Sequence, residues 1–204
     1  MSTPAKRPLR GNPAETRSRL IQIGTEILSE RGFGATSIDQ VLGLASVPKG
    51  SFYYYFDSKA DFGLAVIDNY AFLWEQKLTR LLRDPNVLPL QRVWNYIGEG
   101  ARGLEKYAFR RGCLVGNMGQ ELAGLDDTFR KRILGVLDSW NAYLAACLRE
   151  AQERGDLAAD LDTDKIASFF WFAWEGAVLK AKLERSTTPV DQFRDVVFKQ
   201  ILTR

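Results

Sequence analysis

The side chains that most often do chemistry are scarce in this sequence, which has no histidine and only two cysteines. Without histidine there is no Ser-His-Asp triad, no Cys-His dyad and no histidine-containing metal site. Two cysteines cannot form a cysteine-rich zinc site or a disulfide scaffold, so we expect no metal, no cofactor and a reducing, cytoplasmic setting. A helical enzyme that uses carboxylates or Lys182 is the catalytic alternative, and this composition does not favour it.

One of the two cysteines has neighbours that could activate it. Cys113 follows Arg110 and Arg111 and stands near the start of an expected helix, and both features would lower the pKa of its thiol. Cys147 lies in the apolar run at residues 143–148 and is expected to be a buried, inert thiol. Cys113 is therefore a candidate sensing residue, with ordinary core packing as the alternative.

A second group of residues has the spacing of a DNA-binding motif. Residues 37–56, SIDQVLGLASVPKGSFYYYF, predict two short helices joined by a turn at residues 45–47. In a helix-turn-helix the second helix lies in the major groove of DNA. Phe52 and Phe56 are spaced to anchor that helix to the core, which turns Lys49 outward toward base and phosphate acceptors.

The aromatic run at residues 53–55 has two interpretations. Tyr53, Tyr54 and Tyr55 could be core aromatics, but helical spacing prevents all three from facing one core. At least one must be exposed beside the small residues Gly50 and Ser51, where the backbone can approach DNA closely. The run therefore favours a contact surface.

The basic charge is concentrated at the N-terminal end of the chain. Residues 1–60 hold eight Lys and Arg against five Asp and Glu, whereas residues 61–204 hold twenty of each. A basic arm, expected at residues 1–13, carries Lys6, Arg7 and Arg10 among prolines that keep it extended. This asymmetry points to an anionic partner for the N-terminal part, with a solvated tail as the alternative.

Helix start signals recur along the whole chain. Ser37 with Gln40 forms a capping box, and Ser58 begins a long helix in the same way. Further helices are expected over residues 89–107, 126–154 and 164–184, and from 188 onward. No stretch alternates like a strand, and the longest uncharged run, of ten residues, is too short to span a membrane. We predict an all-α fold with about nine helices.

At residues 14–74 the sequence resembles the DNA-binding domain of the TetR family of regulators. The resemblance rests on residues 32–33, 35–38, 45, 47, 49–56 and 59. It implies that Thr36, Ser37, Tyr53 and Lys59 bind phosphates and that Lys49, Gly50 and Ser51 lie nearest the bases, while Tyr54 and Tyr55 complete the surface. Tyr55 stands where the family usually has histidine. The resemblance also implies a dimer on a palindromic operator, with residues 75–204 as the ligand-binding and dimerisation domain.

Residues 111–114, 120–121, 174–177 and 181–182 are similar to one branch of that family, which includes repressors of acrylate utilisation and of N-ethylmaleimide reductase. Members of the branch respond to small electrophiles or unsaturated acids. The similarity implies that Cys113 is the sensing thiol and that the ligand site also holds Arg110, Arg111, Asn117, Trp171, Trp174, Glu175 and Lys182. Alternatively, the arginines and Lys182 simply bind a carboxylate, or the regulator has no small-molecule input.

The predicted helix at residues 164–184 is apolar nearly all round its central part, so it should be buried on two sides. One side can fill the core and the other can meet a second copy of the chain. We place Trp171 and Phe172 at such a dimer interface, together with Phe193 and Val197 of the last helix. An ordinary core helix is the alternative.

Overall fold

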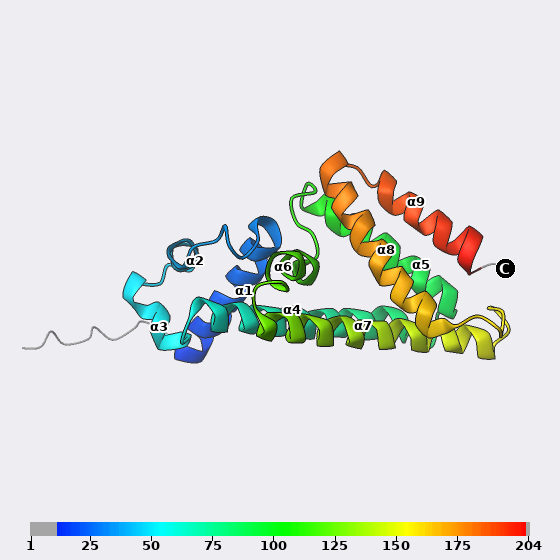
Figure 1. Ribbon diagram of the computed structural model, residues 1–204, viewed down its shortest axis with the longest axis horizontal. Helices are drawn as coiled ribbons and strands as arrows, with labels where there is room; N and C mark the ends of the chain where they lie inside the picture. The colour runs from blue at the N-terminus through cyan, green and yellow to red at the C-terminus, as the bar shows by residue number, and fades with distance from the viewer. Residues whose placement is uncertain (1–11, 203–204) are drawn as a thin grey trace, which may run out of the picture.

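The computed structural model describes residues 12–202, and this range contains nine α-helices and no β-strand (Figure 1). The all-α prediction is confirmed. The basic residues of the expected arm, Lys6, Arg7 and Arg10, lie outside the described residues. None of the helices in the described range is long and apolar enough to cross a membrane.

The N-terminal lobe is built from three helices. α1 spans Pro13–Arg31, α2 spans Ile38–Leu44, and α3 spans Phe52–Tyr55 after a single 3-10 turn at Lys49–Ser51. Ser37 accepts a hydrogen bond from the Gln40 amide while the Gln40 side chain accepts from the Ser37 amide, which is the predicted capping box. The turn between α2 and α3 passes through Ser46, whose φ of 52° is left-handed.

Phenylalanines hold the short α3 in place. Phe52 and Phe56 are buried, and their rings lie 5.7 and 5.0 Å from that of Phe62 on the next helix. The predicted anchoring pair is therefore confirmed, and it fixes which sides of α3 face outward.

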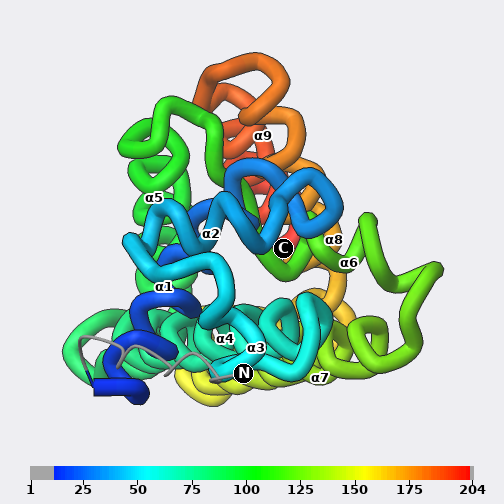
Figure 2. Tube along the Cα trace, turned by 90° about the vertical axis from the view of Figure 1, so that its left-hand side faces the viewer, coloured from blue at the N-terminus to red at the C-terminus, as the bar shows by residue number. Residues whose placement is uncertain are grey.

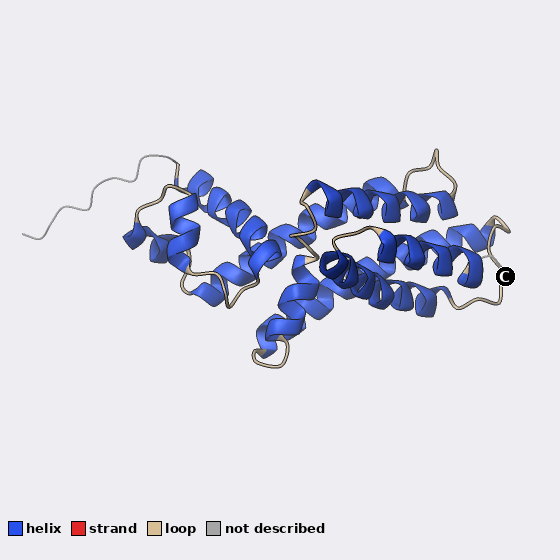
Figure 3. Cartoon of the chain, turned by 90° about the horizontal axis from the view of Figure 1, so that it is seen from above, coloured by secondary structure: helices blue, strands red, loops and turns tan. Residues whose placement is uncertain are grey.

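The helix α4, Lys59–Leu82, is shared by both lobes. Its first turn is capped by Ser58, which accepts from the Asp61 amide, and packs against α1 and α3. Its remaining turns run beside α7 through the larger C-terminal lobe (Figure 1), and Figure 3 shows the described residues as helices joined by loops. The lobes are therefore joined by one continuous helix rather than by a linker.

The C-terminal lobe contains α5 (Pro89–Lys106), α6 (Leu114–Leu122), α7 (Asp127–Glu153), α8 (Thr163–Glu184) and α9 (Thr188–Val196), which continues as a π-turn to Ile201. Its core is aromatic, with Tyr96, Trp140 and Trp171 packed ring against ring. The N-cap of α8 is Asp162, one residue before the expected Thr163.

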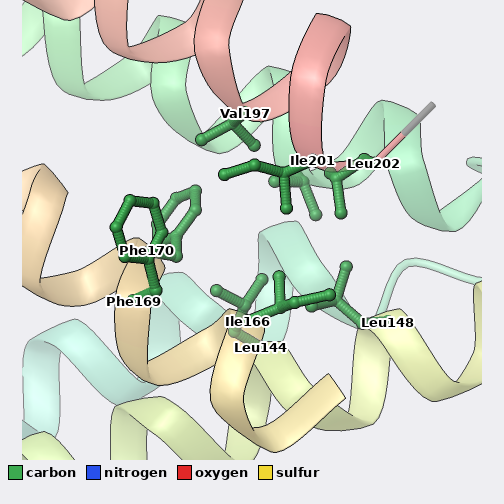
Figure 4. Close-up of a pocket in the computed structure, with 9 residues that line it drawn as sticks. Leu144, Leu148, Ile166, Phe169, Phe170, Val197, Ile201 and Leu202 are labelled. Carbon is green, nitrogen blue, oxygen red and sulfur yellow. The ribbon is translucent and has the colours of Figure 1, made fainter. Parts of the chain in front are cut away.

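Aliphatic and phenyl side chains fill the junction of α7, α8 and α9 (Figure 4). Leu144, Ile166, Phe170 and Val197 face one another there and leave a void of about 10 Å³, roughly the space of one water molecule. This junction therefore fastens α9 to the bundle and has no room for a ligand.

Candidate functional site

α3 lies at the end of the molecule that faces the viewer in Figure 2, and its outer side carries predicted DNA-binding side chains. Tyr53 and Tyr54 are 69% and 65% exposed, and Lys49 and Gly50 are exposed at the preceding turn. The ammonium of Lys49 lies 2.6 Å from a carboxylate oxygen of Asp39. Because both members of this ion pair are largely exposed, the pair is weak and the lysine can exchange partners.

Two residues predicted to contact DNA face the protein instead. Thr36 is buried, and its hydroxyl donates a 2.8 Å hydrogen bond to the Gly32 carbonyl. Tyr55 is half-buried against the core, with its ring 5.0 Å from that of Tyr54. Neither side chain is presented to solvent in this structure: Thr36 lies in the loop before α2 with its hydroxyl bonded to Gly32, and Tyr55 lies on the inner side of α3.

The remaining two predicted phosphate ligands stand at helix starts. Ser37 caps α2 and is exposed. Lys59 is half-buried and donates a 2.8 Å hydrogen bond to the Phe33 carbonyl, with its ammonium over the Phe33 ring. An ammonium has three protons, so Lys59 keeps donors for a phosphate.

The loop between α1 and α2 is held by the C-terminal lobe. The carboxylate of Glu121, at the end of α6, accepts hydrogen bonds from the amides of Phe33, at 2.8 Å, and Gly34. Gly32 begins this loop with a φ of 83°, a conformation that favours glycine. Glu121 therefore ties α6 directly to the segment that leads into the DNA-binding helices.

A cavity of about 370 Å³ lies between the two lobes. Its walls come from α1, α4, α5, α8 and the loop before α6. Aromatic side chains form much of the lining, with polar groups of α1 and α4 along one side. The lining includes Thr25, Glu26, Asn69, Tyr70, Trp74, Lys77, Tyr107, Arg111, Cys113 and Trp174. A ligand in this cavity would touch the first helix of the N-terminal lobe.

Cys113 lines the cavity, but its environment differs from the prediction. The thiol is buried at the N-cap of α6, where its sulfur accepts from the Gly116 amide at 3.4 Å. Burial, and then the nearby Glu175 carboxyl, raise the pKa of Cys113 well above its ordinary value. The expected lowering of this pKa is therefore wrong, and the thiol is protonated at neutral pH.

The two arginines that were expected to activate Cys113 are paired elsewhere. Arg111 lies 3.1 Å from Glu26, and Arg110 lies 3.9 Å from Glu30, both on α1. Arg111 lines the cavity, whereas Arg110 is exposed outside it. Arg111 therefore lines the cavity, and its charged partner is Glu26 rather than the Cys113 thiol.

Glu175 stands behind Cys113 rather than in the cavity wall. One of its carboxylate oxygens is buried without a hydrogen-bond partner among the described residues, and burial raises its pKa. Gly116 lies against the other oxygen, so any side chain at position 116 would collide with this carboxyl.

Of the other predicted ligand residues, the structure brings only Trp174 to the cavity wall. Asn117 donates to the Ser29 carbonyl of α1, and Lys182 packs beside Gly112. Trp171 is buried between Tyr96 and Trp140, so its assignment to both the ligand site and the dimer interface is wrong.

Sequence reasoning missed most of the cavity wall. Tyr70, Trp74 and Lys77 recur every three or four residues on one side of α4, and this periodicity could have identified them as one surface. Lys77 is largely buried and lies 3.4 Å from Glu99, and burial lowers its pKa. Cys147 is buried as expected, and burial raises its pKa to about 11.

The outward side of α8 and α9 is apolar, but not at all the predicted positions. Phe172 is 75% exposed, in agreement with an interface. Phe193 and Val197 are buried against the protomer's own core, with the Phe193 ring 5.0 Å from that of Phe170. Their assignment to the interface is therefore wrong. The exposed apolar side chains on α8 and α9 are Phe169, Phe172, Leu179, Leu183 and Val196.

Two family models cover most of this architecture. Residues 20–66 match that of the bacterial regulatory proteins of the tetR family, and residues 89–197 match the tetracyclin repressor-like C-terminal domain. The chain belongs to the TetR family. It is a DNA-binding transcriptional regulator and not an enzyme, as the helix-turn-helix predicted.

Individual relatives are similar to this chain over most or all of its length. The transcriptional regulator AcuR of Cereibacter sphaeroides is 42% identical over 100% of this chain and 95% of its own length. The transcriptional repressor NemR of Escherichia coli (strain K12) is 30% identical over 87% of this chain and 89% of its own length. A crystal structure of a regulatory protein TetR from Rhodobacter sphaeroides is similar with a TM-score of 0.87 at 43% identity, over 90% of this chain and 97% of that one. These relatives support the predicted branch and make the chain a TetR-family repressor.

Proposed function

We propose that this repressor binds a palindromic operator as a homodimer in the cytoplasm and that a small molecule in the interlobe cavity releases it. The observation that carries the proposal is the composition of the cavity wall. The wall includes Thr25 and Glu26 of α1, so a bound molecule contacts the DNA-binding lobe as well as the regulatory lobe. Ligand and operator then favour different arrangements of the lobes, and each weakens binding of the other.

The outer face of α8 supports the dimer. Phe172, Leu179 and Leu183 follow helical spacing along one side, and Val196 of α9 adds to this apolar patch. An exposed apolar patch of this kind is typical of an interaction site, and a two-fold axis would pair it with its own copy. Two linked recognition helices then engage both operator half-sites.

The inducer class we propose is a small electrophile or unsaturated acid of the acrylate type. The cavity offers a thiol at Cys113, a cation at Arg111 and aromatic walls. In a covalent response, the sulfur of Cys113 bonds to the terminal alkene carbon, and the thiol proton passes to the carbon next to the carbonyl. Because the thiol is protonated, this addition is slow, and its selectivity comes from access through the cavity.

A gel-shift titration with acrylate, acrolein and N-ethylmaleimide tests this function. Wild type and Cys147→Ser should be released alike, because Cys147 lies outside the cavity wall. Cys113→Ser should bind operator normally and lose release by acrolein and N-ethylmaleimide.

Two outcomes would contradict parts of this proposal. If Cys113→Ser is released by the electrophiles as readily as wild type, the thiol is a packing residue. If no small molecule that occupies the cavity changes operator affinity, the regulator has no ligand input of this kind.

A further inference from the structure

An ion pair between the two lobes stands in the cavity wall. A guanidinium nitrogen of Arg111 lies 3.1 Å from a carboxylate oxygen of Glu26 on α1, and both side chains line the cavity. The guanidinium also lies over the Tyr107 ring, 4.2 Å from its centre. Stacking on Tyr107 fixes the plane of Arg111 independently of its carboxylate partner.

The Glu26 carboxylate is a replaceable partner. The side chain of Glu26 is 50% exposed, whereas that of Arg111 is 24% exposed, so the carboxylate is the more mobile member. Only one nitrogen of Arg111 donates to Glu26. Exposed ion pairs contribute little, whereas a guanidinium can hold a well-placed carboxylate through two parallel hydrogen bonds.

We propose that Arg111 is the anion subsite of the cavity and that an entering carboxylate takes the place of Glu26. The ligand class is a small monocarboxylic acid, because the neighbouring wall of Tyr70, Trp74 and Trp174 suits a short apolar tail. This inference rests on the proposed function and specifies its chemistry. It includes no covalent step.

The exchange gives the ligand a direct effect on α1. Arg111–Glu26 is the shortest ion pair between α1 and the C-terminal lobe within residues 12–202. The other links nearby are longer or uncharged. Glu30 of α1 lies 3.9 Å from Arg110 and 4.0 Å from Arg111, and single neutral hydrogen bonds run from Gly112 and Asn117 to the Ser29 carbonyl and from Asn69 to Thr25. A ligand carboxylate on Arg111 therefore removes the closest charged link and leaves the weaker ones.

The other cation in the wall is a poorer subsite. Lys77 already faces Glu99, which also pairs with Arg80 at 2.8 Å. A carboxylate at Lys77 would have to separate a three-membered network and would not reach α1.

Calorimetry with the full-length protein tests the exchange, using propionate as the carboxylate probe and propionamide as its neutral counterpart. Propionate should bind wild type and propionamide should not. Arg111→Gln should lose about tenfold or more in propionate affinity, the effect of removing a hydrogen bond to a charged group. Glu26→Gln should bind propionate several-fold more tightly, because its competitor is gone, and should bind operator several-fold more weakly. Glu153→Gln, an exposed change on α7, is the matched control and should change neither affinity.

Circular dichroism and the unfolding midpoint establish that each variant is folded. The assignment of the anion subsite to Arg111 would be overturned if Arg111→Gln bound propionate with wild-type affinity. It would also be overturned if only Lys77→Met lost propionate binding. Unchanged propionate affinity in Glu26→Gln would overturn the exchange. If Arg111→Gln keeps wild-type propionate affinity while acrolein still releases its operator at the wild-type concentration, the proposed function stands and this inference alone fails.

Discussion

The two ends of the molecule use aromatic side chains in opposite ways. On α3, Tyr53 and Tyr54 are exposed on a helix of four residues. In the C-terminal lobe, Tyr70 lines the cavity beside Trp74, and Tyr96 is buried against Trp174. The short helix has one anchored side and leaves the rest of its aromatics free to contact a partner. The long helices bury Tyr70 and Tyr96 but expose Phe172, so aromatic content alone does not distinguish a contact surface from a ligand site.

The C-terminal lobe itself contains a buried phenylalanine, Phe193, and an exposed one, Phe172, and this contrast gives the largest expected effect. Phe193→Glu places a charge in the buried contact with Phe170 and Trp174, and should lower the free energy of unfolding by at least about 3–5 kcal/mol, the cost of emptying a buried Phe site. Phe172→Glu, on the exposed side, should instead give folded monomers with much weaker operator binding. Urea unfolding and light scattering measure the two effects. A folded, stable Phe193→Glu monomer would reverse the assignment of these two residues.

At the DNA-binding end, Lys49→Ala should cost about 1–3 kcal/mol of operator affinity and relax the base preference, because Lys49 is exposed at the start of the recognition segment. Its affinity should also fall less steeply with salt. Lys165→Ala, on the distant α8, is the control and should leave operator affinity unchanged. Fluorescence anisotropy with operator and scrambled DNA makes the measurement. Equal affinity and preference in Lys49→Ala would show that α3 is not the recognition helix.

The smallest expected effect is on stability, and it compares the buried carboxyl of Glu175 with an exposed carboxyl. Burial raises the pKa of Glu175 above its ordinary value of 4.5, so the folded chain holds this proton more tightly than the unfolded chain does. The resulting stabilisation is complete below the unfolded pKa and is lost as the pH rises through the folded value. Glu175→Gln should therefore be more stable than wild type at neutral pH and about equally stable at low pH.

Unfolding midpoints across the acid range measure that difference. Glu105→Gln, an exposed change on α5, should show no such pH dependence relative to wild type. A Glu175→Gln variant that loses stability at neutral pH would mean that the folded protein needs the charge.

Local signals predicted the helices well, because caps and anchors act within a few residues. Ser37, Ser58 and Asp126 each accept a hydrogen bond from an amide two or three residues ahead. The environment of Cys113 could not be predicted in this way. The partner of Arg111 is Glu26, 85 residues away in the sequence, and only the tertiary fold brings the two together.

The prediction of the dimer-interface residues was wrong for a different reason. α8 is apolar on most of its circumference, so periodicity shows that two sides are covered but not which side is inside. Only the packing of α9 on Phe170 decides it.

Because α4 is one continuous helix, a tilt of its cavity-lining turns also moves its first turn. The helix has 24 residues, or about 36 Å of length, and the cavity touches it from Asn69 to Lys77. If α4 tilts by about 5° about its cavity-lining turns, its first turn, and α3 with it, moves by about 2 Å. In the two-fold dimer proposed above, both α4 helices would move, and the recognition helices would change their separation by about 4 Å, which is roughly the 3.4 Å step between successive base pairs. A shift of this size would move one protomer out of register with the half-site that we propose for it.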